Sequence, residues 1–290
     1  MMSPSHAAET LTAELTPMDF LRRLGESGDG PHDLITAALM LSALDRPDKK
    51  LSPFRAHIGQ LVEAVRDEAH FARDADSAAR ALSSVIALRY GYEGERENYD
   101  DPQNADIMSV IERRRGLPVA LGILYMHAAR ACGMDACGLL SPGHFLVRIG
   151  VRGSETLVDP FNSGAVVERE PVDAPGFGAQ FVHELDSGDM PDPLAPVSDG
   201  DVLLRLQNNI KTRALKIRET ARAIEILKRM TLIAPKRNIL WLELAHLQES
   251  LGALSAARAA YENCLKLSRT GEDVSNEAAF ALHALKRRLN

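Results

Sequence analysis

His144 and Asp159 are the two residues whose types and spacing point most directly to chemistry. They stand at the two ends of a predicted β-hairpin in which Gly150–Gly153 forms the connection. If this four-residue loop is symmetric, equal steps outward from it bring His144 opposite Asp159. Opposed residues of an antiparallel pair have Cβ atoms about 4.5–5.5 Å apart. We therefore expect an imidazole and a carboxylate within hydrogen-bonding reach.

Such a pair needs a nucleophile. In Cys–His–Asp hydrolases and acyl transferases the histidine is the base, the aspartate orients it, and the thiolate lies at a helix N-terminus, whose dipole lowers the thiol pKa. The predicted helix before the hairpin begins at Pro118, and none of the residues Leu117–Leu121 has a thiol or a hydroxyl. Covalent acyl transfer is therefore not expected. The structural alternative for His144 is a strand-edge histidine that bonds to the backbone.

The three cysteines do not supply the missing group. Cys132 lies at the far end of the same helix, about 21 Å along its axis from Pro118. Cys137 falls in a predicted inner strand, where it could approach His144 but would lack a helix dipole, and a buried cysteine is most often a small hydrophobe. With Cys264 the count is odd and the spacing does not repeat, which favours reduced thiols over a disulfide framework.

Other kinds of site are not indicated. His127, His144 and His183 show no ligand spacing, and neither an HxxxH nor a CxxC motif occurs, so we expect no metal and no cofactor. No glycine-rich phosphate loop is present. The run Arg113–Arg115 is better explained as a solvated helix end than as an anion site, although it flanks the predicted cleft.

A polar segment over residues 92–104 precedes the Pro118 helix and allows two interpretations. In the first, its side chains line the cleft and bind a ligand. In the second, they cap helices and tie down a long loop. The residues concerned are Asn98, Tyr99, Asp101 and Asn104.

The composition is that of an ordinary globular protein. The 290 residues are enough for two domains and are 45% hydrophobic and 26% charged. A net charge of −6 argues against broad electrostatic binding to nucleic acid or an anionic membrane. The most apolar stretch, residues 117–129, is too short to span a membrane, and residues 1–14 lack a signal-peptide pattern. We expect a cytoplasmic protein.

The predicted elements divide the chain into four parts. Residues 1–15 form a disordered N-terminus, and residues 16–185 form a helical extension plus an α+β core. Residues 186–201 are a linker rich in Pro, Gly and Asp, and residues 202–290 form a helical domain.

One helix dominates the expected core. Nearly every residue from Pro118 to Ala131 is small or apolar, which is typical of a helix buried on all sides. Helices are also expected from Pro17 after the N-cap Thr16, and at residues 34–44, 61–65, 81–88 and 106–115, with stops at Gly116 and, after the central helix, at Gly133. Strands are expected at residues 136–140, 144–149 and 154–159.

The C-terminal part repeats itself every 34 residues, which is the period of the tetratricopeptide repeat. A generic helical bundle is the alternative. Stacked helical hairpins commonly expose a face that binds peptides or proteins, although two units could also simply dock on the core. The matching positions are Leu206 and Leu240, Ile210 and Leu244, Ala223 and Ala257, Leu227 and Tyr261, and Ile233 and Leu267.

These features together resemble a known family. The chain is similar to the bacterial transglutaminase-like family with a tetratricopeptide tail, often named after the SirB invasion regulators. The resemblance implies a papain-like α+β core with a small antiparallel sheet, an α-helical N-terminal extension and C-terminal α-hairpins. It is carried by Gly116-Leu117-Pro118, the buried helix, Gly133, Pro142-Gly143-His144-Phe145 and Asp159-Pro160-Phe161-Asn162, with Asn98-Tyr99, Asp101-Pro102 and Asn104 upstream.

The sequence departs from this family at the catalytic cysteine. Active transglutaminase-like enzymes carry Gly-x-Cys at the start of the core helix, about fifteen residues before the glycine that ends it. Counting back from Gly133 reaches Pro118, so the resemblance implies a degenerate site that keeps only His144 and Asp159.

Our leading hypothesis is a non-catalytic binding or regulatory protein whose cleft holds an unidentified protein or peptide. The alternative is a hydrolase in which His144 and Asp159 use water or an atypical thiol as the nucleophile. The expected binding residues are Asn98, Tyr99, Asp101, Asn104, Pro142, Gly143, Phe161 and Asn162.

Overall fold

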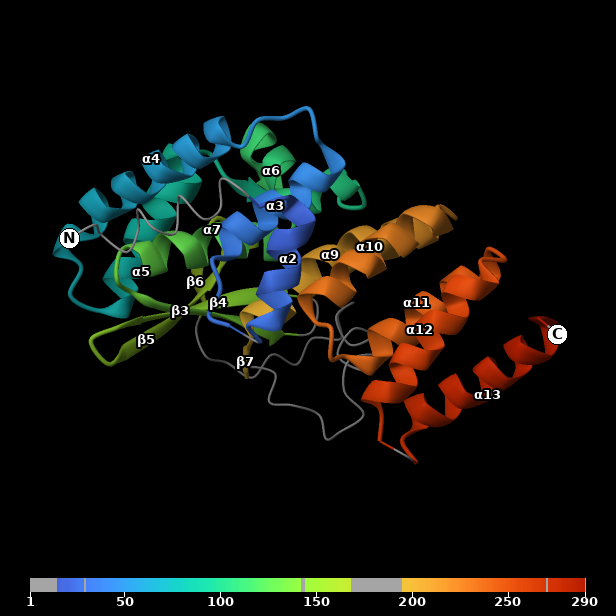
Figure 1. Ribbon diagram of the computed structural model, residues 1–290. Coiled ribbons are helices and arrows are strands. Elements are labelled where there is room, and N and C mark those ends of the chain that lie inside the picture. The colour runs from blue at the N-terminus through green and yellow to red at the C-terminus, as the bar shows by residue number, and fades with distance from the viewer. Residues whose placement is uncertain (1–14, 29, 142–143, 168–194, 270, 290) are drawn as a thin grey trace. The chain divides into compact units, whose positions relative to one another are not determined.

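The computed structural model describes residues 15–28, 30–141, 144–167, 195–269 and 271–289, with the backbone alone at residues 140, 141, 144 and 289. The chain is mostly helical with a small antiparallel sheet, which confirms the expected α+β class (Figure 1). It divides into two compact units. One unit comprises residues 30–206, and the other joins residues 1–29 to residues 207–290.

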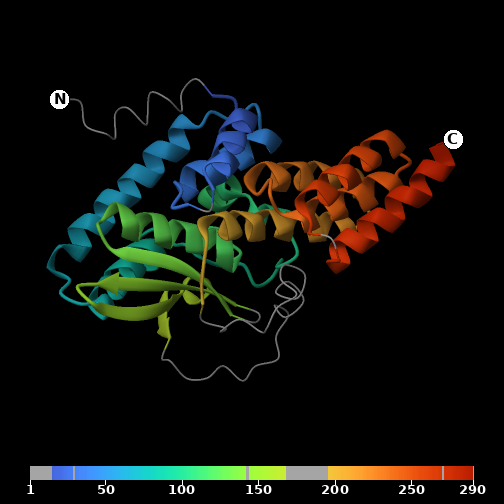
Figure 2. The ribbon, with the colours of Figure 1, turned by 60° about the horizontal axis from the view of Figure 1, so that its bottom comes forward.

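A five-stranded antiparallel sheet in the order β6-β5-β4-β3-β7 forms one layer of the first unit. The helices α5 and α7 pack against its strands, so that helices cover the sheet in a second layer (Figure 2). The strands are β3 (Asp135–Ser141), β4 (His144–Val151), β5 (Ser154–Asp159), β6 (Ala165–Val167) and β7 (Pro196–Val197).

Helices and short turns make up the rest of this unit. The α-helices are α3 (Leu34–Asp45), α4 (Ser52–Glu68), α5 (Ala75–Ser83), α6 (Ile107–Arg113) and α7 (Pro118–Ala131). The shorter elements are η1 (Ala69–Phe71), the π-helical η2 (Ser84–Arg89), β1 (Glu93–Gly94), η3 (Pro102–Ala105), β2 (Arg115–Gly116) and η4 (Pro160–Asn162). No helix in the described part of the chain is both long and apolar enough to cross a membrane.

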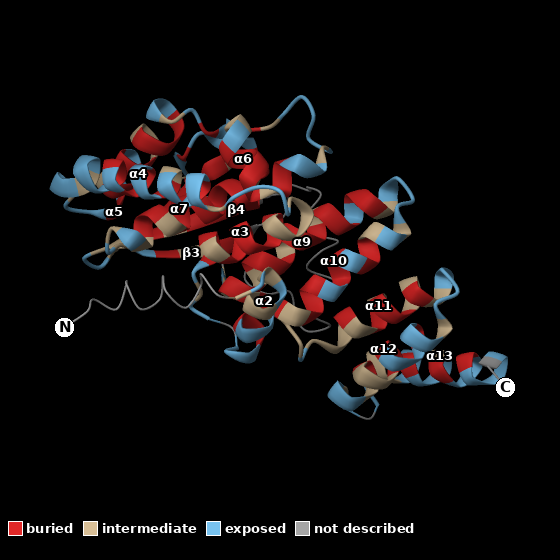
Figure 3. Ribbon diagram, turned by 45° about the horizontal axis from the view of Figure 1, so that its top comes forward, coloured by how far each residue is buried: buried red, intermediate tan, exposed pale blue. Residues whose placement is uncertain are grey.

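The helix α7 is buried around almost its whole circumference, as its sequence predicts, with Pro118, His127 and Arg130 partly exposed (Figure 3). Ala120, Leu121 and Ile123 are fully inaccessible, although they point in different directions. Gly122 lets the helix approach the sheet, because a Cβ atom there would lie 2.4 Å from the ring of Phe145. This contact fixes the spacing between α7 and β4.

The β4–β5 hairpin differs from the symmetric loop that the sequence suggested. Its turn is Arg152-Gly153, whose φ angles of 49° and 84° are those of a tight two-residue turn. Gly150 and Val151 therefore stay in β4, and Val151 pairs with Ser154. The predicted register, with His144 opposite Asp159, was wrong by two residues.

Two further expected boundaries also differ from the structure. The helix α6 ends at Arg113 because Arg114 takes the left-handed conformation with φ 62°, so Gly116 is not its stop. In the expected linker, residues 186–194 lie outside the described residues. Pro196–Val197 pairs with β3 as β7, and α9 (Asp199–Lys216) already begins at Asp199.

The second unit contains the repeat helices and the N-terminal helix α2 (Pro17–Glu26). Thr16 caps α2 as predicted, and Gly25 lets it pack closely on α10. The repeat helices are α9, of which residues 207–216 belong to this unit, α10 (Thr220–Ile233), α11 (Asn238–Ser250), α12 (Leu254–Leu267) and α13 (Asp273–Leu289). Most residues matched at 34-residue spacing are buried, among them Ala223, Ala257, Leu227 and Tyr261.

A pair of glycine substitutions tests the packing of α7. Gly122→Ala should lower the free energy of unfolding by about 1–3 kcal/mol, because the added methyl overlaps the Phe145 ring. Gly59→Ala in the exposed middle of α4 is the matched control, and it should raise stability by about 0.5–1 kcal/mol because nothing lies within 4 Å of its Cβ. Chemical denaturation measures both, and equal effects would contradict the close approach.

Candidate functional site

The start of α7 is the position at which an acyl-transfer enzyme would hold its nucleophile. Pro118 is the first helical residue and Leu117 the N-cap, without a side-chain capping bond. The side chains of Leu117, Val119 and Ala120 are at most 1% exposed. Among the described residues no acceptor receives the N–H groups of Val119 and Ala120. The helix end is therefore present, but a half-buried proline and buried apolar side chains form it.

Asp159 serves as the N-cap of η4. Its Oδ1 accepts from the backbone N–H of Phe161 at 2.9 Å and of Asn162 at 3.2 Å, and its Oδ2 accepts from the Asn162 side-chain amide. Pro160 takes the first helical position, where an N–H group would have no acceptor within the helix in any case. The Asp-Pro-Phe-Asn sequence thus folds into a capped turn in which Asp159 is buried and its carboxylate already receives three hydrogen bonds.

His144 begins β4, where its backbone pairs with Ser141 of β3. The last β4–β5 pair is Val147 with Val158, so one further step would bring Asp159 opposite Leu146, two residues from His144. The His144 side chain, like Pro142 and Gly143, lies outside the described residues. The participation of these three residues in the site stays a prediction.

Neither cysteine of this unit has the environment of a nucleophile. Cys137 pairs with Arg148, whereas His144 pairs with Ser141. Cys137 and Ser141 are four residues apart on β3, so the backbone of Cys137 lies about 13 Å along the strand from the position opposite His144. Burial raises the pKa of the Cys137 thiol, and it also raises that of Cys132, whose Sγ contacts the Val62 carbonyl oxygen at 3.8 Å. Catalytic cysteines need the opposite shift.

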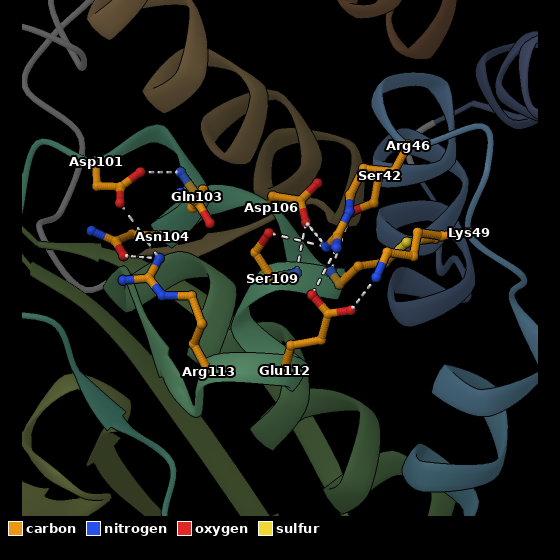
Figure 4. Close-up of polar contacts among 11 residues, drawn as sticks. Ser42, Arg46, Lys49, Asp101, Gln103, Asn104, Asp106, Ser109, Glu112 and Arg113 are labelled. Atoms are coloured by element: carbon orange, nitrogen blue, oxygen red, sulfur yellow. Dashed lines mark hydrogen bonds and ion pairs between the residues drawn. The ribbon is translucent and has the colours of Figure 1, made fainter.

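Asn104 is fully buried and connects the polar loop to α7 through Leu117; Figure 4 shows its contact with Arg113. Its amide donates to the carbonyl oxygens of Asn98 at 2.7 Å and Tyr99 at 3.4 Å, and its side-chain oxygen accepts from Arg113. Its own carbonyl oxygen accepts from the N–H of Leu117 at 2.8 Å. Asn104 therefore performs the loop-tying role that was one of the two interpretations.

Arg113 and Asp101 complete this tie. Arg113 lies 3.5 Å from a Glu95 carboxylate oxygen and 3.7 Å from one of Asp101. Asp101 also caps η3 by accepting from the N–H of Gln103. Figure 4 shows the Asp101 contacts beside a second network, in which Arg46, the residue that follows α3, donates to Glu112 of α6. Both networks hold α6 and the loop before it in place.

An accessible aromatic cluster lies next to these ties. The ring of Phe161 packs edge-on against Tyr99, with centroids 6.0 Å apart, and the Arg96 guanidinium lies 5.0 Å from the Phe161 centroid. Arg96 also donates to the Asn162 side-chain oxygen. Tyr99 is 44% exposed, and Gly94 leaves room for the Phe161 ring. Three predicted binding residues, Tyr99, Phe161 and Asn162, thus come together.

Sequence reasoning missed Arg96 and Arg205. Arg96 belongs to the polar segment but was not singled out, although a cation beside an aromatic residue is a common binding signal. Arg205 was assigned to the helical tail, yet its guanidinium lies 6.0 Å from the Phe145 ring, and burial lowers its pKa. Only the fold reveals that contact.

The start of α7 lies away from a hollow in this unit, and no metal-ligand cluster is found in the described part of the chain. A hollow of about 500 Å³ lies at the opposite end of that helix, lined among others by Cys132, Gly133 and the Arg152-Gly153 turn. Within the described ranges, no three side chains of His, Cys, Asp or Glu gather in a way that could hold a metal ion.

A family model described as the transglutaminase-like superfamily matches residues 52–208, more than half of the chain. The chain belongs to this superfamily. A tetratricopeptide repeat model matches residues 210–280, which confirms the repeat assignment. The transglutaminase-like match begins at the first residue of α4 and runs through the sheet into α9, so it contains the capped Asp159 turn and the start of α7.

Bacterial UPF0162 proteins are similar to this transglutaminase-like chain. The one from Xylella fastidiosa strain 9a5c is 27% identical over 226 residues, which cover 73% of this chain and 78% of that protein. The Vibrio cholerae protein is 28% identical over 143 residues, covering 49% and 53%. A crystal structure of menin is weakly similar, with a TM-score of 0.40 and 12% identity over 86% of this chain and 70% of that chain.

Removing the Asn104 tie should cost stability. Asn104→Ala deletes three hydrogen bonds in a fully buried place, so we expect the free energy of unfolding to fall by about 2–4 kcal/mol. The exposed Asn98, whose side chain makes no hydrogen bond in the described structure, is the matched control, and Asn98→Ala should change stability by less than about 0.5 kcal/mol. Denaturant titration compares the two variants. An unchanged free energy of unfolding in Asn104→Ala would contradict a stabilising role for these hydrogen bonds.

Proposed function

We propose that this transglutaminase-like protein is a non-catalytic binding protein that regulates a protein or peptide partner in the cytoplasm. The observation that carries the proposal is the start of α7, where a proline and buried hydrocarbon occupy the place of the nucleophile. A helix N-terminus can lower a pKa or stabilise charge only for a group that is present.

The remnant pair supports the same conclusion. Three hydrogen bonds hold the Asp159 carboxylate against η4, so orienting an imidazole is not its principal role. The cysteine thiols of this unit have raised pKa values because they are buried, and Cys137 lies four register positions from the strand partner of His144. An atypical thiol enzyme would need the opposite arrangement.

Binding is supported by the aromatic cluster and by the tetratricopeptide helices. Phe161 has the Tyr99 ring on one side and the Arg96 guanidinium on another, and both neighbours are accessible. An aromatic residue fixed between a second ring and a cation provides a rigid contact surface at low conformational cost. Repeats of the kind matched in the tail commonly contact other proteins.

The absence of catalysis is directly testable. The purified full chain should show no hydrolysis or transamidation of amide substrates above background, and alkylation of its cysteines should change nothing. The water-based alternative depends on His144 as general base, so His144→Ala is the discriminating variant. Turnover that vanishes in a folded His144→Ala protein would establish the hydrolase instead.

The aromatic cluster predicts where a partner binds. Phe161→Ala removes the central ring. It should lower the amount of specific partner recovered with the chain at least tenfold in quantitative affinity purification from the native cell. Phe71→Ala is the matched control, because Phe71 is 84% exposed on η1 and belongs to a different surface. A partner set that is unchanged by Phe161→Ala, or equally reduced by Phe71→Ala, would contradict binding at the cluster.

A further inference from the structure

The central arginine of the Arg113–Arg115 run differs from its neighbours. Arg113 forms ion pairs with two carboxylates of the polar loop, and Arg115 forms one with Glu93. Arg114 forms no ion pair within the described residues and lies instead against His57 of α4 and the buried Tyr92. The sequence interpretation of the whole run as a solvated helix end therefore fails at this position.

The Arg114 guanidinium is held from two sides. Its Nη1 lies 2.7 Å from His57 Nε2 and donates to the Tyr92 hydroxyl, and its Nη2 lies 3.5 Å from His57 Nδ1. Its Cζ lies 4.7 Å from the Tyr92 ring centroid. The backbone of Arg114 is in the left-handed region, which is an unfavourable conformation for arginine.

This cluster contains more donors than acceptors. A neutral imidazole accepts a hydrogen bond at one nitrogen and donates at the other, whichever tautomer it adopts. Both nitrogens of His57 face N–H groups of Arg114, so one facing pair joins two donors. The Tyr92 hydroxyl oxygen lies 2.9 Å from Nε2 and already accepts from Arg114, and the hydroxyl adds one more hydrogen that needs an acceptor. An oxygen from outside would satisfy these donors.

The cluster is also positively charged, which favours an anion as the surplus of donors does. Burial, together with the charge of Arg114, lowers the pKa of His57 to about 4, so the imidazole is neutral at pH 7 and Arg114 carries the positive charge. A second cation, Arg89, lies 5.9 Å from the centroid of Tyr90, whose ring packs edge-on against His57. Among the described residues neither arginine forms an ion pair with a carboxylate.

We propose that Arg114, His57 and Tyr92 form a binding site for an oxyanion, the carboxylate or phosphoryl group of a small ligand. The guanidinium provides a planar fork that suits either group, while the imidazole and phenol fix its orientation. The site is independent of the proposed partner-binding cluster and does not require catalysis. It gives the transglutaminase-like unit a way to sense an anionic small molecule.

The test uses inorganic phosphate and acetate as probes on the full chain. Each is titrated against sodium chloride at matched ionic strength, while NMR follows the His57 ring nitrogens and the backbone amide of Arg114. We expect a saturable shift with at least one probe. Saturation by phosphate alone identifies a phosphoryl ligand, and saturation by acetate alone identifies a carboxylate.

Three variants make the test specific. Arg114→Gln should weaken binding at least tenfold, and Tyr92→Phe, which removes only the hydroxyl, should weaken it several-fold. Arg115→Gln removes the neighbouring charge that already pairs with Glu93 and should leave the affinity within twofold. No saturable shift with either probe overturns the proposal, as does full affinity in Tyr92→Phe or in folded Arg114→Gln.

Discussion

Burial of α7 on every side is the constraint on which the rest of the transglutaminase-like unit depends. A helix with no solvated face must be covered by strands on one side and by helices and loops on the others. Gly122 sets its distance from the sheet through Phe145, and the N–H of Leu117 is satisfied by the Asn104 carbonyl oxygen. The position of the polar loop therefore follows from the need to cover the start of this helix.

The same constraint determines which side chains lie at the start of α7. In a thiol enzyme the exposed start of the central helix holds the reactive group, whereas here that start consists of a half-buried proline among buried apolar side chains, beside a tied loop. Asp159 and Asn104 retain polar side chains, but both use them to close turns. The accessible side chains near the start of α7 are those of Phe161, Tyr99 and Arg96, to which we assign partner binding in our proposal.

The sequence predicted elements better than it predicted contacts. The Thr16 cap, the apolar helix α7 and the 34-residue period follow from local patterns that tertiary packing did not override. The hairpin register was missed because Gly150 suggested a loop, whereas the turn formed at Arg152-Gly153. The contacts of Arg114 and Arg205 could not have been predicted, because their partners come from distant parts of the chain.

The ionisation of the cysteine thiols tests the central claim most directly. Rates of alkylation at Cys132, Cys137 and Cys264, followed residue by residue by mass spectrometry across a pH series, give the pKa of each thiol. An inactive scaffold predicts three values above that of an ordinary cysteine, because burial disfavours each thiolate. A thiol that ionises well below neutral pH and reacts much faster than the others would show that the chain holds a nucleophile after all.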